Sequence, residues 1–311
     1  MSIIEQAAKR LEQLTRAGIG VVPAVPADSA AAGTAAPAPH AAGATLVRPS
    51  FAPRAPVEPA PVDLVGAHEV QLDLARLAQQ GVMVPTDSRS RRAEELRVIK
   101  RPLLKNARSK DASAQRLSLI MMTSALPGEG KTYSSINLAM SIATEIDVAV
   151  LLVDADVLRR NAMARLGVDV EDGLMDLLVD ESRPLEDVVL RTNVPKLSLL
   201  PAGRRHDLST ELLASAAMDR LLQRLATGFR RLVVVFDAPP LLVTSEAKVL
   251  AGRLGQVVMV VEAERTERAA IAQAFAAVEQ CPIVMSILNK TTASSDGEGY
   301  GYGYGYGYGY E

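Results

Sequence analysis

The sequence predicts an α/β protein with a doubly wound, mostly parallel sheet. From residue 117 onward, short runs that are apolar on both faces alternate with segments of helical periodicity, which is the pattern of buried parallel strands joined by helices. A glycine-rich loop follows the first run, and two later runs end in aspartate. We expect strands at 117–123, 148–153, 197–200, 232–236, 256–261 and 283–288.

Composition narrows the class of protein. A chain of 311 residues that is 48% apolar can bury one α/β core and still leave an appendage outside it. The formal net charge of -2 argues against a general nucleic-acid binder. The single cysteine, Cys281, fits a reducing compartment, and His40, His68 and His206 lie too far apart in sequence to suggest zinc. No apolar run suits a membrane span or a signal peptide, so we expect a soluble, cytoplasmic protein.

The amino-terminal region divides into two predicted parts. Residues 1–18 place apolar side chains on one helical face, either as a solvated or locally packed helix or as a docking element for a partner or a membrane surface. Residues 19–66 are rich in Ala and Pro, and nine of the 18 prolines fall between 21 and 62. This composition predicts a disordered linker.

The predicted folded domain covers residues 67–290, and a flexible tail covers 291–311. The domain begins with a helical or mixed segment that ends at Gly81, followed by a charged helix over 88–104 that is bounded by Pro102. From 299 to 310 the tail alternates glycine and tyrosine without interruption.

The segment 125–132 reads A-L-P-G-E-G-K-T and lies between a predicted strand and a predicted helix, the context that a phosphate-binding loop requires. Glycines let backbone N–H groups turn towards phosphate oxygens, and the following helix N-terminus favours an anion. Lys131 would contact the phosphates and Thr132 would bind Mg²⁺. In the usual pattern G-x-x-x-x-G-K-S/T the first residue is glycine, and this chain has Ala125 at that position. The expected nucleotide-binding residues are Gly128, Glu129, Gly130, Lys131, Thr132 and Tyr133.

Carboxylates follow two of the predicted strands. Asp154 and Asp156 leave the strand at 148–153, and Asp237 ends the strand at 232–236. The carboxyl edge of a parallel sheet is where α/β proteins bind ligands. A single strand-terminal aspartate is more often a helix cap, but two such strand ends behind one phosphate-binding loop favour a metal site formed by Thr132, Asp154 and Asp237.

These motifs resemble those of the bacterial tyrosine kinases of polysaccharide export loci, in particular the stand-alone tyrosine autokinases found with exopolysaccharide and exosortase systems. The resemblance covers residues 88–311 and the amino-terminal helix. It implies a P-loop NTPase fold of the MinD/ParA type, with ATP and Mg²⁺ as cofactors. Its Walker A, A′ and B motifs match 125–132, 150–156 and 232–237. The implied catalytic residues are Lys131, Asp154 and Asp156, with Asp156 as the base, and Asn289 would face the adenine.

The resemblance also implies partners. Glu94, Arg97 and Lys100 match the family's E-x-x-R-x-x-R oligomerisation helix, except that lysine lacks the bidentate fork of arginine. The alternative is a solvated helix face with i,i+3 ion pairs. Family members work with a transmembrane chain-length determinant, or polysaccharide co-polymerase, which would recruit this chain to the inner face of the plasma membrane. The resemblance also implies that the chain forms a homo-oligomer such as a ring. It further implies a phosphotyrosine phosphatase as a partner, and it implies no nucleic-acid partner.

The tail supplies the expected phosphate acceptors, Tyr300, Tyr302, Tyr304, Tyr306, Tyr308 and Tyr310. Glycine spacing gives each phenol freedom to enter an active site, and about 20 residues reach roughly 25 Å on average. A phenol with a pKa near 10 needs a base such as Asp156 as it attacks phosphorus. Gly-Tyr repeats can instead be associating low-complexity segments that are never modified.

Two other functions compete with an autokinase that controls polysaccharide chain length, polymerisation or export. ParA/MinD-type partitioning or positioning ATPases share the fold, but they carry an extra lysine near the start of the loop, where this chain has Ala125 and Leu126. A regulatory adaptor that binds ATP without chemistry would not need the complete set of carboxylates. The sequence therefore favours the kinase.

Overall fold

The computed structural model describes residues 68–87, 89–109, 116–229 and 231–291. The predicted amino-terminal helix at 1–18, the linker at 19–66 and the six tail tyrosines lie outside the described residues. Within the described ranges, no helix is long and apolar enough to cross a membrane.

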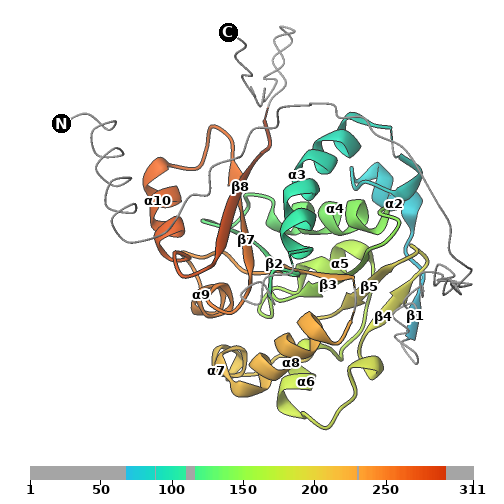
Figure 1. Ribbon diagram of the computed structural model, residues 1–311, viewed down its shortest axis with the longest axis vertical. Coiled ribbons are helices and arrows are strands. Elements are labelled where there is room, and N and C mark those ends of the chain that lie inside the picture. The colour runs from blue at the N-terminus through green and yellow to red at the C-terminus, as the bar shows by residue number, and fades with distance from the viewer. Residues whose placement is uncertain (1–67, 88, 110–115, 230, 292–311) are drawn as a thin grey trace, which may run out of the picture. The chain divides into compact units, whose positions relative to one another are not determined.

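An eight-stranded sheet organises the described residues, in the order β1-β4-β5-β3-β6-β2-β7-β8 (Figure 1). Neighbouring strands are parallel except β4 and β5, which confirms the predicted fold class. All six predicted strands are present. The structure adds β1 and β4, whose three residues each are too short to show a periodicity. The strands are β1 (His68–Val70), β2 (Leu119–Ser124), β3 (Ala149–Asp154), β4 (Leu190–Thr192), β5 (Leu197–Leu200), β6 (Leu232–Asp237), β7 (Gln256–Glu262) and β8 (Ile283–Asn289).

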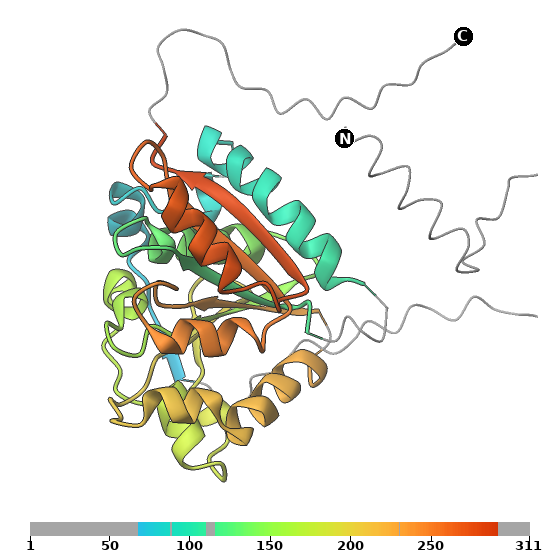
Figure 2. The ribbon, with the colours of Figure 1, turned by 90° about the vertical axis from the view of Figure 1, so that its left-hand side faces the viewer.

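Helices cover both faces of the sheet (Figures 1 and 2). One face carries α2 (Leu74–Gln79), α3 (Arg91–Ala107), α4 (Lys131–Ala143) and α5 (Asn161–Leu166). The other carries α6 (Leu174–Val179), α7 (Ser209–Ala214), α8 (Ala216–Thr227), α9 (Ser245–Ala251) and α10 (Arg268–Ala276). Two short 3-10 helices, η1 (Pro85–Asp87) and η3 (Leu185–Asp187), lie in the connections.

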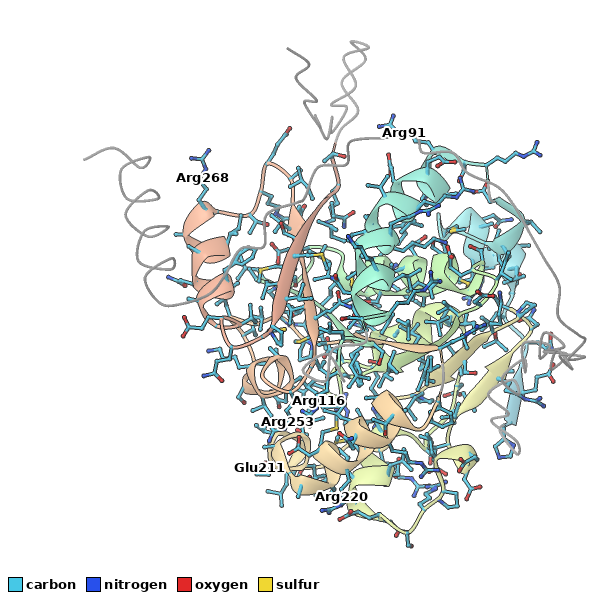
Figure 3. All side chains as sticks on the ribbon, viewed as in Figure 1. Arg91, Arg116, Glu211, Arg220, Arg253 and Arg268 are labelled. Carbon is cyan, nitrogen blue, oxygen red and sulfur yellow. The ribbon has the colours of Figure 1, made fainter. Side chains whose placement is uncertain are left out.

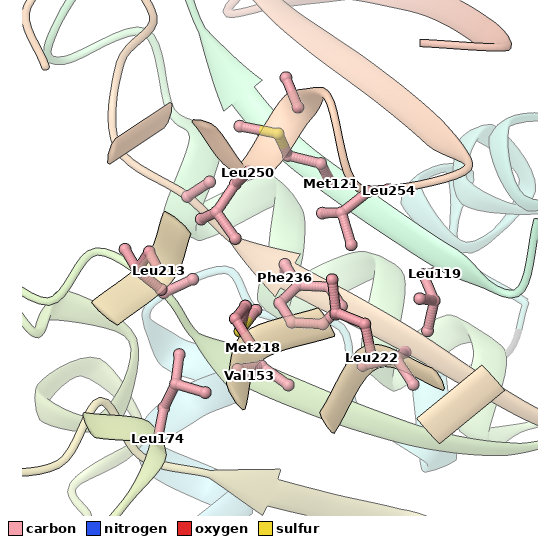
Figure 4. Packing of buried hydrophobic residues seen from close by; sticks show 14 of the residues in the cluster. Leu119, Met121, Val153, Leu174, Leu213, Met218, Leu222, Phe236, Leu250 and Leu254 are labelled. Carbon is pink, nitrogen blue, oxygen red and sulfur yellow. The ribbon is translucent and has the colours of Figure 1, made fainter. Parts of the chain in front are cut away.

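Two hydrophobic cores lie on opposite faces of the sheet, because successive strand side chains point in opposite directions. In β6, Val233 and Val235 belong to the core under α4, whereas Val234 and Phe236 belong to the core under α8. Figure 4 shows Phe236 against Met218 and Leu222 of α8. Burial on both faces accounts for strand sequences that are apolar throughout.

Helix α3 extends beyond its predicted end. It begins after Ser90, whose Oγ accepts a hydrogen bond from the Ala93 amide at 3.1 Å, and it continues through Pro102 to Ala107. The prediction that Pro102 bounds the helix was wrong. Proline has no N–H for the carbonyl of Val98, but both residues are exposed, so water can satisfy that carbonyl.

Lys100, the third residue of the predicted oligomerisation motif, is buried inside the chain, and its oligomerisation role stays a prediction. Its side chain is only 3% exposed, and its Nζ donates to the Ser141 carbonyl at 2.7 Å and to Thr144 Oγ1 at 3.2 Å. The same ammonium pairs with Glu145 at 2.7 Å, which lowers the pKa of that carboxyl. Lys100 therefore fastens α3 to the carboxyl end of α4, inside the chain.

Glu94 and Arg97 lie on the outer side of α3, where they form an i,i+3 ion pair. Arg91 and Glu95 pair at 2.9 Å on the same helix, and Figure 3 shows Arg91 at its amino-terminal end. The exposed face of α3 thus carries two ion pairs between residues of the same helix. The oligomerisation role of Glu94 and Arg97 stays a prediction.

We expect Lys100→Met to lower the free energy of unfolding by about 2 kcal/mol, because it removes the ion pair with Glu145 and the hydrogen bonds that Lys100 Nζ donates to Ser141 and Thr144. Glu145 is 30% exposed and can be rehydrated, which keeps the loss below that of a fully buried pair. Lys105→Met, at an exposed position of the same helix, is the control and should change stability by less than about 0.5 kcal/mol. Denaturant unfolding measures both, and equal effects would contradict this role of Lys100.

Candidate active site

The loop at 125–132, here called the P-loop, connects β2 to the amino terminus of α4. Gly128 and Gly130 have φ angles of +91° and +99°, a left-handed conformation that side chains disfavour. A Cβ on Gly130 would also lie 2.0 Å from Asn289 Nδ2. The backbone conformation therefore favours glycine at 130, and a side chain there would displace the Asn289 amide from the P-loop. The arrangement directs the amino terminus of a 13-residue helix to the carboxyl edge of the sheet.

Strand pairing brings the predicted carboxylates together at this edge. Asp154 lies directly beside Asp237 in the parallel β3–β6 pair, and Asp156 follows two residues after Asp154. All three are buried, with exposures of 1% or less. Lys131 Nζ lies 2.7 Å from Asp156 Oδ2 and 3.8 Å from Asp237 Oδ1. The structure thus unites one ammonium and three carboxylates that are up to 106 residues apart in sequence (131 to 237).

Burial controls the protonation of two of these carboxylates. It raises the pKa of Asp154 to about 7, with a further contribution from the neighbouring charge of Asp237, although backbone N–H groups of Ala162 and Met163 oppose the rise. Burial also raises the pKa of Asp237, against the attraction of Lys131 and a hydrogen bond from Thr132. A second cation at the site would favour the charged form of both groups.

The predicted metal ligands present suitable oxygen atoms. Among the described residues, Asp154 Oδ1 and Asp237 Oδ2 are buried without a hydrogen-bond partner. Thr132 is also buried, and its hydroxyl lies 3.4 Å from Lys131 Nζ. Magnesium prefers carboxylate and hydroxyl oxygens together with phosphate and water. These residues fit Mg²⁺ bound with a nucleotide.

Three other predicted nucleotide residues have identified protein contacts. The carboxylate of Glu129 accepts a hydrogen bond from the Leu126 amide at 2.7 Å. The Tyr133 hydroxyl donates to the Gly81 carbonyl at 2.6 Å, so its phenol contacts the segment after α2. Asn289 Nδ2 donates to the Glu129 carbonyl at 2.8 Å, which places its amide against the P-loop. Direct contacts of these side chains with a nucleotide stay predictions.

Several residues that support the site were not predicted from the sequence. Ser135 Oγ donates to Asp237 Oδ1 at 3.1 Å, and its position one helical turn after Lys131 was a signal that could have identified it. Thr266 and Lys290 contact the P-loop from the segments that follow β7 and β8. They follow the P-loop by more than 130 residues in sequence, and no local pattern marks them.

A parallel sheet, a glycine loop before a helix, and buried carboxylates beside the loop lysine define a P-loop nucleotide-binding protein. The family profile described as AAA domain matches residues 118–283, which is more than half of the chain. The tyrosine-protein kinase YwqD of Bacillus subtilis is 30% identical over 204 residues, which is 65% of this chain and 82% of YwqD. The chain belongs to the family of bacterial tyrosine kinases.

Two further comparisons agree with this family. The kinase domain of Escherichia coli tyrosine kinase ETK matches with 29% identity and a TM-score of 0.52, covering 62% of this chain and 72% of that domain. The provisionally named tyrosine-protein kinase EpsB of Ralstonia nicotianae is 37% identical over 149 residues, or 48% of this chain. The chain spans 19% of EpsB, which is a much longer protein.

We expect Asp154→Asn to stabilise the nucleotide-free protein at alkaline pH. A folded pKa of about 7, raised from 3.8, means that stability is full below pH 3.8 and falls as the pH rises to about 7. Asparagine does not ionise, so the variant does not lose stability in this way as the pH rises. Its advantage in unfolding free energy over the wild-type protein should grow between those pH values to on the order of 4 kcal/mol and then stay constant. Denaturant unfolding from pH 4 to 8 tests this, and a difference independent of pH would contradict it.

Proposed function

We propose that this chain is an ATP-dependent tyrosine autokinase that transfers the γ-phosphate to tyrosines of its own carboxyl-terminal tail. The observation that carries the proposal is the 2.7 Å contact between Lys131 Nζ and the buried carboxylate of Asp156, at the amino terminus of α4. This contact places a cation for phosphate beside a base for an acceptor. Relatives named as tyrosine-protein kinases support the same reaction.

Each site residue has a role in this reaction. The N–H groups of the P-loop orient the phosphates, and Lys131 balances the negative charge that develops on the transferred group. Thr132, Asp154 and Asp237 would hold Mg²⁺, which supplies further positive charge. Asp156 accepts the phenol proton as the tyrosine oxygen bonds to phosphorus and the bond to ADP breaks. Lys131 pairs with Asp156, so a shift of its ammonium towards a phosphate would free that carboxylate to accept the proton.

The carboxyl-terminal tail suits the role of phosphate acceptor because it is rich in glycine and tyrosine and because it follows β8, which ends beside the P-loop. The described chain ends at residue 291, directly after β8, whose last residue Asn289 contacts the P-loop. A fully extended tail of twenty residues would measure about 65 Å, long enough for its tyrosines to enter the active site of an adjacent subunit in a compact oligomer. Glycine at alternate positions makes the six tyrosines chemically equivalent acceptors.

The same proposal includes the cellular context. A cytoplasmic kinase recruited to the inner face of the membrane by a transmembrane polysaccharide co-polymerase would control polysaccharide chain length, polymerisation or export. Glu94 and Arg97 of α3 would contact neighbouring subunits in a homo-oligomer such as a ring. A phosphotyrosine phosphatase would return the tail to its starting state.

Lys131→Met should abolish tail phosphorylation, because it removes the cation that balances the transferred group. We expect a loss of at least about 100-fold, measured by anti-phosphotyrosine blotting after incubation with ATP and Mg²⁺. A variant with all six tail tyrosines replaced by phenylalanine identifies the acceptor, and Lys105→Met is the charge control. Phosphate release by the wild-type protein without tail labelling would instead support a ParA/MinD-type ATPase.

Full phosphorylation should dissociate the oligomer. Each phosphate adds about -1.5 to -2, so six add about -9 to -12 to each chain. Against a starting net charge of -2, this addition makes neighbouring tails strongly repulsive. Light scattering before and after phosphorylation measures the change, with the six-phenylalanine variant as control. An oligomer of unchanged size after complete phosphorylation would contradict the electrostatic switch.

A further inference from the structure

The end of β8 holds the P-loop through two backbone carbonyls. Asn289 Nδ2 donates to the Glu129 carbonyl and Lys290 Nζ donates to the Gly128 carbonyl, each at 2.8 Å. Lys290 is fixed in turn by an ion pair with Glu262 at 3.1 Å. Two consecutive residues of one strand end therefore bind two consecutive peptide groups of the loop.

The end of β7 contacts the same part of the loop through Glu129. One carboxylate oxygen of Glu129 accepts the Leu126 amide at 2.7 Å, and the other accepts the hydroxyl of Thr266. Thr266 also accepts the Glu262 amide at 3.1 Å, which connects this hydroxyl to the last residue of β7. With an exposure of only 2%, Glu129 serves as an internal anchor of the loop.

These contacts determine which way the loop N–H groups face. In a trans peptide, the carbonyl of one residue and the N–H of the next point in opposite directions. Holding the carbonyls of Gly128 and Glu129 towards β8 therefore turns the N–H groups of Glu129 and Gly130 away from β8. Those are the groups that a P-loop offers to phosphate. Because glycine has wide backbone freedom, an unsupported loop would spend part of its time in other orientations.

We propose that Asn289, Lys290 and Thr266 are positioning residues that preorganise the P-loop amides for the phosphates of a nucleotide. This inference rests on the nucleotide site of the proposed function and differs from the predicted contact of Asn289 with adenine. Preorganisation raises affinity because the loop loses less freedom when the ligand binds. This gain in affinity should apply to any ligand that places phosphates in the P-loop, whether or not it carries an adenine base.

A comparison of two ligands separates positioning from adenine recognition. MgADP contains both adenine and phosphates, whereas magnesium pyrophosphate contains only phosphates, and both can be measured by displacement of a fluorescent ADP analogue. We expect Asn289→Ala and Lys290→Met each to weaken both ligands by about tenfold, or about 1.4 kcal/mol. Thr266→Val, which removes the hydroxyl and keeps the shape, should weaken both by a smaller factor, and Lys290→Arg should retain affinity through its own donors.

Arg265→Met is the matched control for charge. Arg265 lies in the same loop region and pairs with the same Glu262 at 3.4 Å, but its side chain is 78% exposed. The control should therefore change affinity less than twofold for either ligand, a limit set by the weak effect of exposed charges. Thermal unfolding without ligand should show that Asn289→Ala and Lys290→Met stay fully folded at the temperature of the binding assay, with midpoints lowered by only a few degrees.

Three results would overturn the inference. Loss of ADP affinity with unchanged pyrophosphate affinity in Asn289→Ala would assign that residue to adenine. Equal losses of ligand affinity in Lys290→Met and Arg265→Met would show that Lys290 acts only through its charge and does not position the loop. Unfolding midpoints that fall to the assay temperature without ligand, together with wild-type affinity in Thr266→Val, would leave only structural roles. The assays need no phosphoryl transfer, so normal binding results with an unlabelled tail would count against the proposed kinase function alone.

Discussion

The buried pair of Lys131 and Asp156 is the interaction on which the candidate site depends. Three carboxylates lie within a region that excludes water, and their mutual repulsion and desolvation would be costly without a cation. Lys131 supplies that cation from the first residue of α4, with its Nζ 2.7 Å from Asp156 and 3.8 Å from Asp237. One ammonium cannot balance three ionised carboxylates, and burial raises the pKa of both Asp154 and Asp237. The site is therefore suited to a second cation, which an incoming Mg²⁺ nucleotide would provide.

The sheet explains why this cluster forms at one place. Its central strands are apolar on both faces, so they contribute polar groups to a ligand site mainly at their ends. Parallel pairing sets the carboxyl ends of β2, β3 and β6 side by side, and these strands lead into the P-loop, Asp154 and Asp237. The ends of β7 and β8 reach the P-loop from its other side. A single edge thus carries both the charged groups and the supports of the loop.

The sequence was sufficient for features that depend on local pattern. Buried strands, the glycine loop and the strand-terminal aspartates each have a signal within a few residues. It was insufficient where tertiary contacts decide. Lys100 matched an oligomerisation motif, yet the fold buries it against α4, and α3 continues past Pro102 because the affected carbonyl faces solvent. The contacts of Thr266 and Lys290 join residues more than 130 positions apart, which no periodicity encodes.

The most direct test of the central claim is mass spectrometry of the tail after incubation with ATP and Mg²⁺, comparing the wild-type protein with Asp156→Asn. This substitution keeps the shape of the side chain but removes its ability to accept a phenol proton at neutral pH. The account predicts several phosphotyrosines between residues 300 and 310 in the wild-type protein and a loss of at least about 100-fold in the rate of their appearance in the variant. Equal labelling of both proteins, or a wild-type tail without phosphate, would contradict it.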